Sequence, residues 1–478
     1  MLFNSFNFLI FFPIVLLIYF AIPAKVRYIW VLICSYYFYA SWDFIFIFLL
    51  FFITLITYFA ALGVEIYKKA ETKNLLLVLA ISICFLLLLW FKYINFAIEN
   101  VNHFLEIIGA SKVMPYFDII LPVGVSFYTF QAVGYVIDVY RGKISAEKNI
   151  LRYGLFISFF PQLVAGPIER SGNLLNQLRN IHTINIYNCE NVIHGFRLMI
   201  WGYFEKLLIA DRVAILVDTV YNSYYNYGFW EIATATILFA LQIYCDFDGY
   251  TNIARGVAKI MGMDLMPNFR QPYLAQNIVD FWKRWHISLT TWFTDYLYIP
   301  LGGSRKGKLR NYVNIFIVFL VSGLWHGASW HYVVWGGLHA IYQIVYKIWR
   351  SIRVSLSLPQ NLVNFKVINC IFTFVIVDFA WLFFRAGSMD DAMEMIKCMG
   401  DFVPKVSVYN LGLSSYDWTI LLWSILVLFI VDYHRAKGIR LMKDRGGGFA
   451  CALAVLAIVL FGVYGSGYDV GQFIYFQF

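Results

Sequence analysis

Apolar stretches long enough to cross a bilayer recur from one end of the chain to the other, since a spanning helix needs roughly 20 mostly apolar residues. No polar block between them is long enough to fold separately. Of the 478 residues, 61% are hydrophobic and only 14% are charged, which excludes a water-soluble globular composition. The sequence therefore predicts an all-α polytopic integral membrane protein, with membrane lipid as the partner of its outer surface.

The apolar windows predict about 10 to 12 transmembrane helices. They cover residues 7–22, 28–41, a stretch between Asp43 and Lys68, 75–92, 118–137, 192–221, 228–246, 312–325, 330–349, 366–385, 417–432 and 448–464. Residues 96–108 have an amphipathic pattern instead. We expect a single membrane domain over residues 1–478, in which 434–478 form a C-terminal extension.

Short basic loops mark the cytoplasmic side of a membrane protein. Such loops occur at Lys25 and Arg27, at 68–73, at 141–152 and at 434–445. Alternation between them places both the N-terminus and the C-terminus outside the cytoplasm. The formal net charge of +9 comes from these short clusters of basic residues between apolar windows. Because they do not form a basic stripe, we expect no nucleic-acid partner.

Two apolar segments contain proline and glycine, namely LPVGVSFYTFQAVGY (121–135) and FFPQLVAGPIER (159–170). A backbone that faces lipid cannot leave its amides and carbonyls unpaired. Broken or re-entrant helices that face protein or a water-filled cavity satisfy this limit. At Pro122 a kink within an ordinary packed helix is the alternative, whereas Ala165-Gly166-Pro167 favours a turn.

The chain lacks the motifs of soluble enzymes, such as GxSxG, the Walker loop and HExxH. Its seven cysteines are scattered and include no CxxC pair, which predicts neither a disulfide framework nor a thiolate zinc site. We expect no metal. Ionisable residues inside a membrane are costly, so each of them is a functional hypothesis.

His326 is the strongest of these candidates. It follows the basic group around Arg310, and fifteen residues separate it from Asn311. At about 1.5 Å per residue it lies roughly 22 Å into a hydrocarbon core of roughly 30 Å. Gly323, Gly327 and Ala328 surround it with little bulk, so a substrate or another backbone can come close. The alternative is an imidazole that only bridges two helices.

His286 is the second candidate and lies in FWKRWHISLTTWFTDYLYIPLGG. The tryptophans at 282, 285 and 292, beside Lys283 and Arg284, suggest an interfacial helix with an aromatic belt. One neutral imidazole can take a proton from a hydroxyl while a second orients it or binds the donor. The two histidines together therefore favour chemistry.

Other polar residues favour structural roles. His339 follows in the next apolar window, where packing or hydrogen bonding is the expected role. Asp246 and Asp248 follow another apolar window. We expect them to pair with arginines such as Arg255 or Arg284.

Several long strings carry a resemblance that covers nearly the whole chain. They are MLFNSFNFLIFFPIV, LPVGVSFYTFQAVGYVIDVYRG, FFPQLVAGPIER, YCDFDGYTNIARG, NFRQPYLAQNIVDFWKRWHISLTTWFTDYLYIPLGG and GLWHGASWHYVVWGGLHA. In these strings the chain resembles the membrane-bound O-acyltransferases. Within that family it is similar to the bacterial group that includes alginate O-acetylation proteins, peptidoglycan O-acetyltransferases and the D-alanyl transfer proteins of teichoic acids.

The resemblance implies a catalytic role for His326 and a second functional role for His286. It implies transmembrane, re-entrant and interfacial helices around a central funnel in the bacterial cytoplasmic membrane. We expect Trp285, Trp325 and Gly327 to line that funnel. The resemblance also implies an acyl donor that is a cytoplasmic thioester, with no tightly bound cofactor.

The C-terminal FIYFQF resembles the aromatic ending of the acetylation subgroup and favours acetyl-CoA as donor. Basic residues that could contact its phosphates are Arg305, Lys306, Lys308 and Arg310, although topology alone also explains them. Tail residues expected to bind an extracytoplasmic acetyltransferase are Phe473, Ile474, Tyr475, Phe476 and Phe478.

The first functional hypothesis is therefore transfer of an acetyl group across the membrane for O-acetylation of an extracytoplasmic polysaccharide or peptidoglycan. The second is D-alanyl transfer to teichoic acid from a carrier-protein thioester. A third, from another class, is a transporter or flippase that uses the histidines as a proton relay. A purely structural role as a membrane scaffold is a further alternative. It does not explain why His326 lies deep in the membrane beside small residues.

Overall fold

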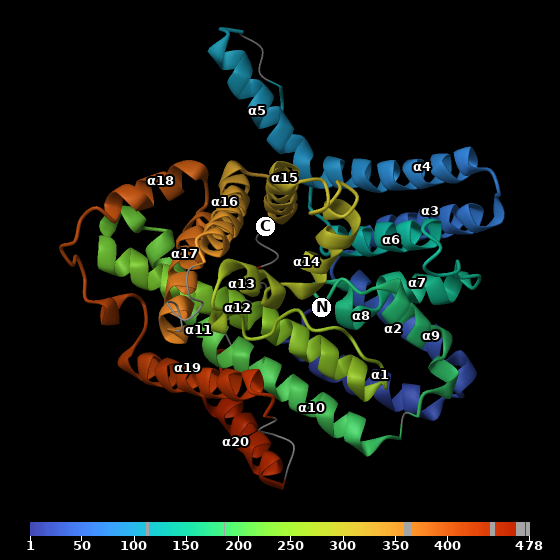
Figure 1. Ribbon diagram of the computed structural model, residues 1–478. Helices are drawn as coiled ribbons and strands as arrows, with labels where there is room; N and C mark the ends of the chain where they lie inside the picture. The colour runs from blue at the N-terminus through green and yellow to red at the C-terminus, as the bar shows by residue number, and fades with distance from the viewer. Residues whose placement is uncertain (111–113, 186, 358–364, 440–444, 465–473, 475–478) are drawn as a thin grey trace. The chain divides into compact units, whose positions relative to one another are not determined.

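The computed structural model describes residues 1–110, 114–185, 187–357, 365–439, 445–464 and 474. Every regular element in these ranges is a helix (Figure 1), which confirms the all-α prediction. The chain divides into two compact units, residues 1–196 with 254–266 and residues 197–253 with 267–478. The boundaries between the units fall inside two long helices, α10 and α12.

The N-terminal unit is built from short and medium helices. They are α1 (Phe6–Ala21), η1 (Ala24–Val26), α2 (Arg27–Ala40), α3 (Phe46–Ile66), α4 (Ala70–Leu88), η2 (Leu89–Tyr93), α5 (Ile94–Ile107), α6 (Val125–Tyr140), α7 (Ile150–Ser158), α8 (Phe160–Leu163), η3 (Ser171–Leu175), α9 (Asn176–Arg179) and η4 (Ile181–Thr183). Helix α3 packs against α4, α6 and α7, and α2 packs against α7.

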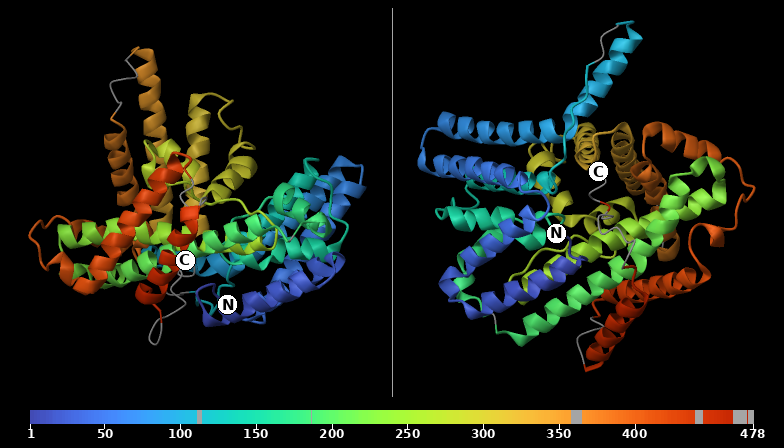
Figure 2. Two further views of the ribbon diagram at one scale, coloured as in Figure 1. Left: turned by 90° about the horizontal axis from the view of Figure 1, so that it is seen from below. Right: turned by 180° about the vertical axis from the view of Figure 1, so that it is seen from behind.

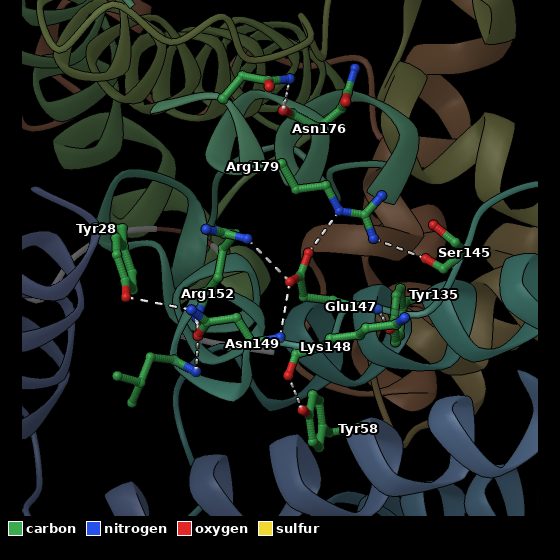
Figure 3. A network of polar contacts seen from close by, with 12 residues as sticks. Tyr28, Tyr58, Tyr135, Ser145, Glu147, Lys148, Asn149, Arg152, Asn176 and Arg179 are labelled. Carbon is green, nitrogen blue, oxygen red and sulfur yellow. Dashed lines mark hydrogen bonds and ion pairs between the residues drawn. The ribbon is translucent and has the colours of Figure 1, made fainter. Parts of the chain in front are cut away.

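A buried glutamate joins several helices of this unit (Figure 3). Glu147 accepts hydrogen bonds from Arg179 Nε at 2.7 Å and Arg152 Nη1 at 3.3 Å. Its own backbone N–H donates to the Tyr135 hydroxyl at 2.8 Å, and the hydroxyl of Tyr58 donates to the next carbonyl at 2.6 Å. The carboxylate is thus shared by arginines of α7 and α9, which offset its burial, while tyrosines of α3 and α6 bond to the backbone of residues 147 and 148.

The second unit contains most of the long helices. They are α10 (Cys189–Phe204) and α12 (Phe229–Ile260), which begin or end in the first unit, and η5 (Glu205–Ala210), α11 (Asp211–Tyr221), η6 (Tyr224–Asn226), η7 (Pro272–Leu274), α13 (Ile278–Arg284), α14 (Ile287–Phe293), η8 (Thr294–Tyr298), α15 (Lys308–His326), α16 (Trp330–Ser355), α17 (Lys366–Arg385), α18 (Met389–Cys398), η10 (Val408–Asn410), α19 (Ser415–Ala436) and α20 (Arg445–Phe461).

Helices α15 and α16 form an antiparallel pair (Figure 2). Gly323 lies against Tyr332 near the connecting turn, and Gly336 lies against Phe319 one step further along. A Cβ at Gly336 would come within 2.2 Å of the Phe319 carbonyl oxygen. Only glycine permits this approach, so the two backbones pack directly on each other.

Four described helices are long and apolar enough to cross a membrane, by length and composition: Phe46–Ile66, Ala70–Ile107, Lys366–Arg385 and Ser415–Ala436. Helices α1 and α20 are apolar but shorter. The positions of α1, α2, α3, α17 and α19 agree with the apolar windows to within a few residues. The full count of 10 to 12 spans stays a prediction.

The two proline-containing segments interrupt the helices of the first unit. Helix α6 begins at Val125, directly after Gly124 with φ of +74°, so Pro122 lies before the helix and the alternative of a kink is wrong. A Cβ at Gly124 would come within 2.6 Å of the Leu163 carbonyl oxygen. The turn at Ala165-Gly166-Pro167 follows α8 and is confirmed.

Candidate active site

His326 is the last residue of α15 and is buried. The helix runs without interruption from Lys308, so the rise per residue used to estimate the depth of His326 applies along its whole length. The imidazole packs edge to face against the rings of Trp335 at 5.0 Å and Phe384 at 5.2 Å. Helices α15, α16 and α17 therefore all contribute to its surroundings.

His286 occupies the short junction between α13 and α14 and is also buried. Its backbone is left-handed, with φ of 41° and ψ of 55°, a region that residues other than glycine seldom adopt. Such conformations persist where the surrounding structure enforces them, and they cluster at functional sites. The junction therefore sets the direction in which this imidazole points.

Hydrogen bonds to a buried asparagine, Asn268, hold the His286 junction in place. The backbone N–H of Ile287 donates to the Asn268 carbonyl at 2.8 Å, and the Ser288 hydroxyl donates to Asn268 Oδ1 at 2.6 Å. The Asn268 amide in turn donates to Thr251 of α12 at 3.1 Å. The two residues that follow His286 are thus tied to Asn268, whose side chain is itself anchored to α12.

The fold brings the two histidines together, although forty residues separate them in sequence. Their ring centroids lie 6.4 Å apart. Trp325 contacts both rings, at 6.0 Å from His286 and 4.9 Å from His326. The two imidazoles are therefore neighbours within one cluster of aromatic rings.

The small residues beside His326 serve helix packing. A Cβ at Gly323 would come within 2.3 Å of the Tyr332 carbonyl oxygen, and one at Gly327 would come within 2.0 Å of the Tyr332 ring. The sequence predicts that these small residues admit either a substrate or another backbone. At Gly323 the structure shows the close approach of another backbone, that of α16. At Gly327 an aromatic side chain from α16 fills the space.

The tryptophans near His286 do not form the expected aromatic belt. Trp282, Trp285 and Trp292 are all at least nine-tenths buried. Trp285 packs on Phe269 and on Trp381 of α17, with ring centroids 4.9 Å apart in both cases. The aromatic belt is wrong because these rings pack within the protein, whereas the position of the segment at the membrane interface stays a prediction. Lining of a funnel by Trp285, Trp325 and Gly327 stays a prediction.

The basic residues predicted to contact acetyl-CoA lie at the opposite end of α15 from His326. Arg305, Lys306, Lys308 and Arg310 are exposed. At about 1.5 Å per residue, roughly 27 Å of helix separate Lys308 from His326. The structure brings these residues together as one exposed group but does not place them beside the imidazoles, and phosphate binding by them stays a prediction.

Asp246 of α12 pairs with a lysine, while the pairing of Asp248 with an arginine stays a prediction. Lys206 Nζ lies 2.7 Å from Asp246 Oδ1 and 2.8 Å from Asp211 Oδ1, with all three side chains buried. Arg284 bonds to Asp280 at 2.9 Å. The prediction that Asp246 pairs with an arginine is therefore corrected. Phe247, the next residue on α12, packs on the His286 ring at 4.8 Å.

One residue of the aromatic tail is described. Ile474 is buried, and its backbone N–H donates to Asp246 Oδ2 at 2.8 Å. Phe473, Tyr475, Phe476 and Phe478, the other tail residues predicted to bind a partner, lie outside the described residues.

Sequence reasoning missed two residues of this site. Asn268 is the first residue of a string that carries the family resemblance, but its role depends on contacts with Thr251 and Ser288 that the string does not show. Lys206 carried a usable signal, because a charged residue within an apolar window is costly and requires a partner.

Comparison with known proteins identifies the family. Residues 31–389, which include both histidines, match the MBOAT, membrane-bound O-acyltransferase family. The chain belongs to this family. It is therefore a multi-pass membrane protein and an O-acyltransferase.

Relatives of this O-acyltransferase include proteins of three named kinds. It is 36% identical to probable alginate O-acetylase AlgI of Pseudomonas putida over 84% of this chain and 81% of the relative. It is 32% identical to peptidoglycan O-acetyltransferase of Helicobacter pylori over 84% of this chain and 80% of the relative. It is 27% identical to teichoic acid D-alanyltransferase of Bacillus subtilis over 55% of this chain and 68% of the relative.

Proposed function

We propose that this O-acyltransferase moves an acetyl group from a cytoplasmic thioester across the cytoplasmic membrane for O-acetylation of an extracytoplasmic polysaccharide or peptidoglycan. Acetyl-CoA is the donor, and an extracytoplasmic acetyltransferase is the partner. The observation that carries the proposal is the pair of buried imidazoles, His326 and His286, with ring centroids 6.4 Å apart. Relatives named for acetylation match 84% of the chain, against 55% for the D-alanyl relative.

The chemistry requires a proton to move while one acyl bond is exchanged for another. An acceptor hydroxyl oxygen attacks the thioester carbonyl carbon, a C–O bond forms, and the C–S bond breaks. His326 takes the hydroxyl proton and returns it to the departing thiolate, so no other reactant is needed. In the alternative, His326 attacks first and carries the acetyl group briefly. His286 orients His326 or the donor.

The experiment measures ester-linked acetate in the cell envelope. Cells that lack the protein are complemented with wild type, His326→Ala, His286→Ala or His182→Ala, and acetate is released by base from fractionated glycans. His182 is exposed and lies in the other unit, so His182→Ala is the matched control. We expect wild type and the control to restore acetate, and the two site variants at equal abundance to fail.

The same base extracts separate the alternatives. Release of D-alanine in place of acetate would assign the second hypothesis. A transporter would bind its substrate without consuming thioester. In that case the transfer of acetate would not depend on chemistry at His326. Full restoration by His326→Ala would contradict the proposal.

A further inference from the structure

The proposed mechanism leaves two buried polar side chains on α16 without a role. Trp335 and His339 lie one helical turn apart on the same face, and both are 0% exposed. The Trp335 ring packs between two imidazoles, 5.0 Å from His326 and 4.9 Å from His339. These two side chains therefore continue the aromatic cluster from His326 along α16.

The hydrogen bonding of His339 assigns the position of its proton. Trp282 Nε1 lies 3.3 Å from His339 Nδ1. An indole nitrogen can only donate, so Nδ1 accepts. A neutral imidazole with an accepting Nδ1 carries its proton on Nε2. His339 therefore presents an Nε2–H donor.

Two neighbouring donors are buried without an acceptor in the described part of the chain. They are His339 Nε2 and Trp335 Nε1. The surroundings of His339 are aromatic, with Phe281 stacked at 6.3 Å and Trp282 edge-on at 5.0 Å. Buried donors are paired in the great majority of cases, so two neighbouring donors that no protein acceptor satisfies are suited to binding a ligand that supplies the acceptor.

We propose that His339 Nε2–H and Trp335 Nε1–H bind a carbonyl oxygen of the acyl donor. The oxygen belongs either to the thioester itself or to an amide in the arm of the donor. Both groups are neutral acceptors, which suits neutral donors among aromatic walls, where a charged phosphate or carboxylate would be costly to bury. His339 is thus a binding residue, while His326 remains the catalytic one. This inference rests on the proposed function.

The test uses the full-length protein in nanodiscs with its extracytoplasmic acetyltransferase and a hydroxyl-bearing glycan as acceptor, acetyl-CoA as donor and release of free thiol as readout. The variants are His339→Phe, which removes both nitrogens, His339→Gln, which keeps a donor and an acceptor, and Trp335→Phe. We expect His339→Phe to raise KM for acetyl-CoA about tenfold, as for loss of one hydrogen bond to a buried group. His339→Gln should recover most of this loss, and Trp335→Phe should raise KM several-fold.

A second donor identifies the bound carbonyl. S-ethyl thioacetate contains a thioester but no amide. If the penalty of His339→Phe persists with it, the donors bind the thioester carbonyl, and if the penalty disappears, they bind an amide of the arm. Trp335→Phe supplies the same comparison should the His339 variants fail to fold.

Two results would overturn the inference. Unchanged KM in folded His339→Phe and Trp335→Phe, while His326→Ala abolishes turnover, would reject the binding role and leave the proposed function intact. An equal loss in His339→Gln and His339→Phe would assign a packing role only. A wild-type protein that neither binds nor consumes acetyl-CoA would instead reject the proposed function, and this inference with it.

Discussion

His286 serves the site through both its backbone and its ring. The left-handed backbone at φ of 41° turns the chain between α13 and α14, while the imidazole faces Phe247 and His326. Substitutions can separate the two contributions, because asparagine tolerates this conformation and a β-branched residue does not.

We expect His286→Asn to fold with near wild-type stability and to lose turnover by about 10²-fold or more, since it keeps the turn and removes the ring. His286→Val should also lose about 1–3 kcal/mol of stability, the usual cost of a strained backbone residue. Thermal unfolding in detergent and thiol release measure the two effects. Equal melting temperatures for the two variants would contradict the argument from backbone strain.

Lys206 should be essential for the stability of the second unit. Lys206→Met leaves Asp211 and Asp246 buried beside each other without their cation, a change that typically costs about 3–5 kcal/mol. Thermal unfolding measures the loss. Lys397→Met is the control, because Lys397 pairs with Glu394 in an exposed position and such pairs contribute little. A Lys206→Met protein as stable as the control would show that the buried pair is dispensable.

The sequence supports some residue roles better than others. His326 is identifiable because a histidine at the end of an apolar window is costly, and His286 because it lies among tryptophans in a string that carries the family resemblance. The partner of Asp246 is not, since Lys206 is forty residues away and only folding brings them within 2.7 Å. The hydrogen bond that Trp282 donates confirms the expected hydrogen bonding of His339. The sequence does not predict which nitrogen of His339 carries the proton, because that depends on this contact.

At the scale of elements, the α15 and α16 pair holds His326 in position. Gly336 faces Phe319 of α15, whereas its neighbour Gly337 has its nearest contact at 3.8 Å, with the Leu320 side chain. Two adjacent glycines in one helix thus meet very different surroundings, and the same substitution tests both.

We expect Gly336→Ala to force α15 and α16 apart, lower the melting temperature and reduce turnover, because a Cβ there cannot avoid the Phe319 carbonyl. Gly337→Ala should be neutral or stabilising by up to about 1 kcal/mol, as for glycine replaced within a helix. Thermal unfolding and thiol release again provide the readouts. Equal tolerance of both substitutions would show that close backbone packing does not position His326.

Apolar windows predict most helices well and fail where polar groups are paired. Helix α12 continues to Ile260, through the polar stretch after residue 246, because Asp246 is satisfied by Lys206 and the helix need not end. Helix α6 starts later than expected because Gly124 packs against α8. The tryptophans of residues 282–292 suggest an aromatic belt in the sequence. The sequence does not show that side chains of α16 and α17 cover Trp282 and Trp285.

At the scale of the whole molecule, the sequence does not predict the division into two compact units. Helices α10 and α12 cross the boundary without a proline- or glycine-rich linker, so nothing in the composition marks a division. The prediction of a single membrane domain with a C-terminal extension from residue 434 stays untested, although residue 434 itself lies within α19.

The predicted membrane orientation places both chain ends outside the cytoplasm. A periplasmic alkaline phosphatase fused after Phe478 should therefore be active, and green fluorescent protein fused at the same position should be dark. Fusions within the basic loop 68–73 should give the reverse result, because short basic loops stay in the cytoplasm. A fluorescent C-terminal fusion would contradict the orientation.

The central claim is that His326 and His286 act as one catalytic unit. A double-mutant cycle on thiol release from acetyl-CoA tests it most directly, with wild type, His326→Ala, His286→Ala and the double variant at equal folded concentration. Residues that act together show strongly non-additive losses. The account predicts that the double variant is no slower than His326→Ala alone. Losses that multiply, or wild-type turnover in His326→Ala, would contradict it.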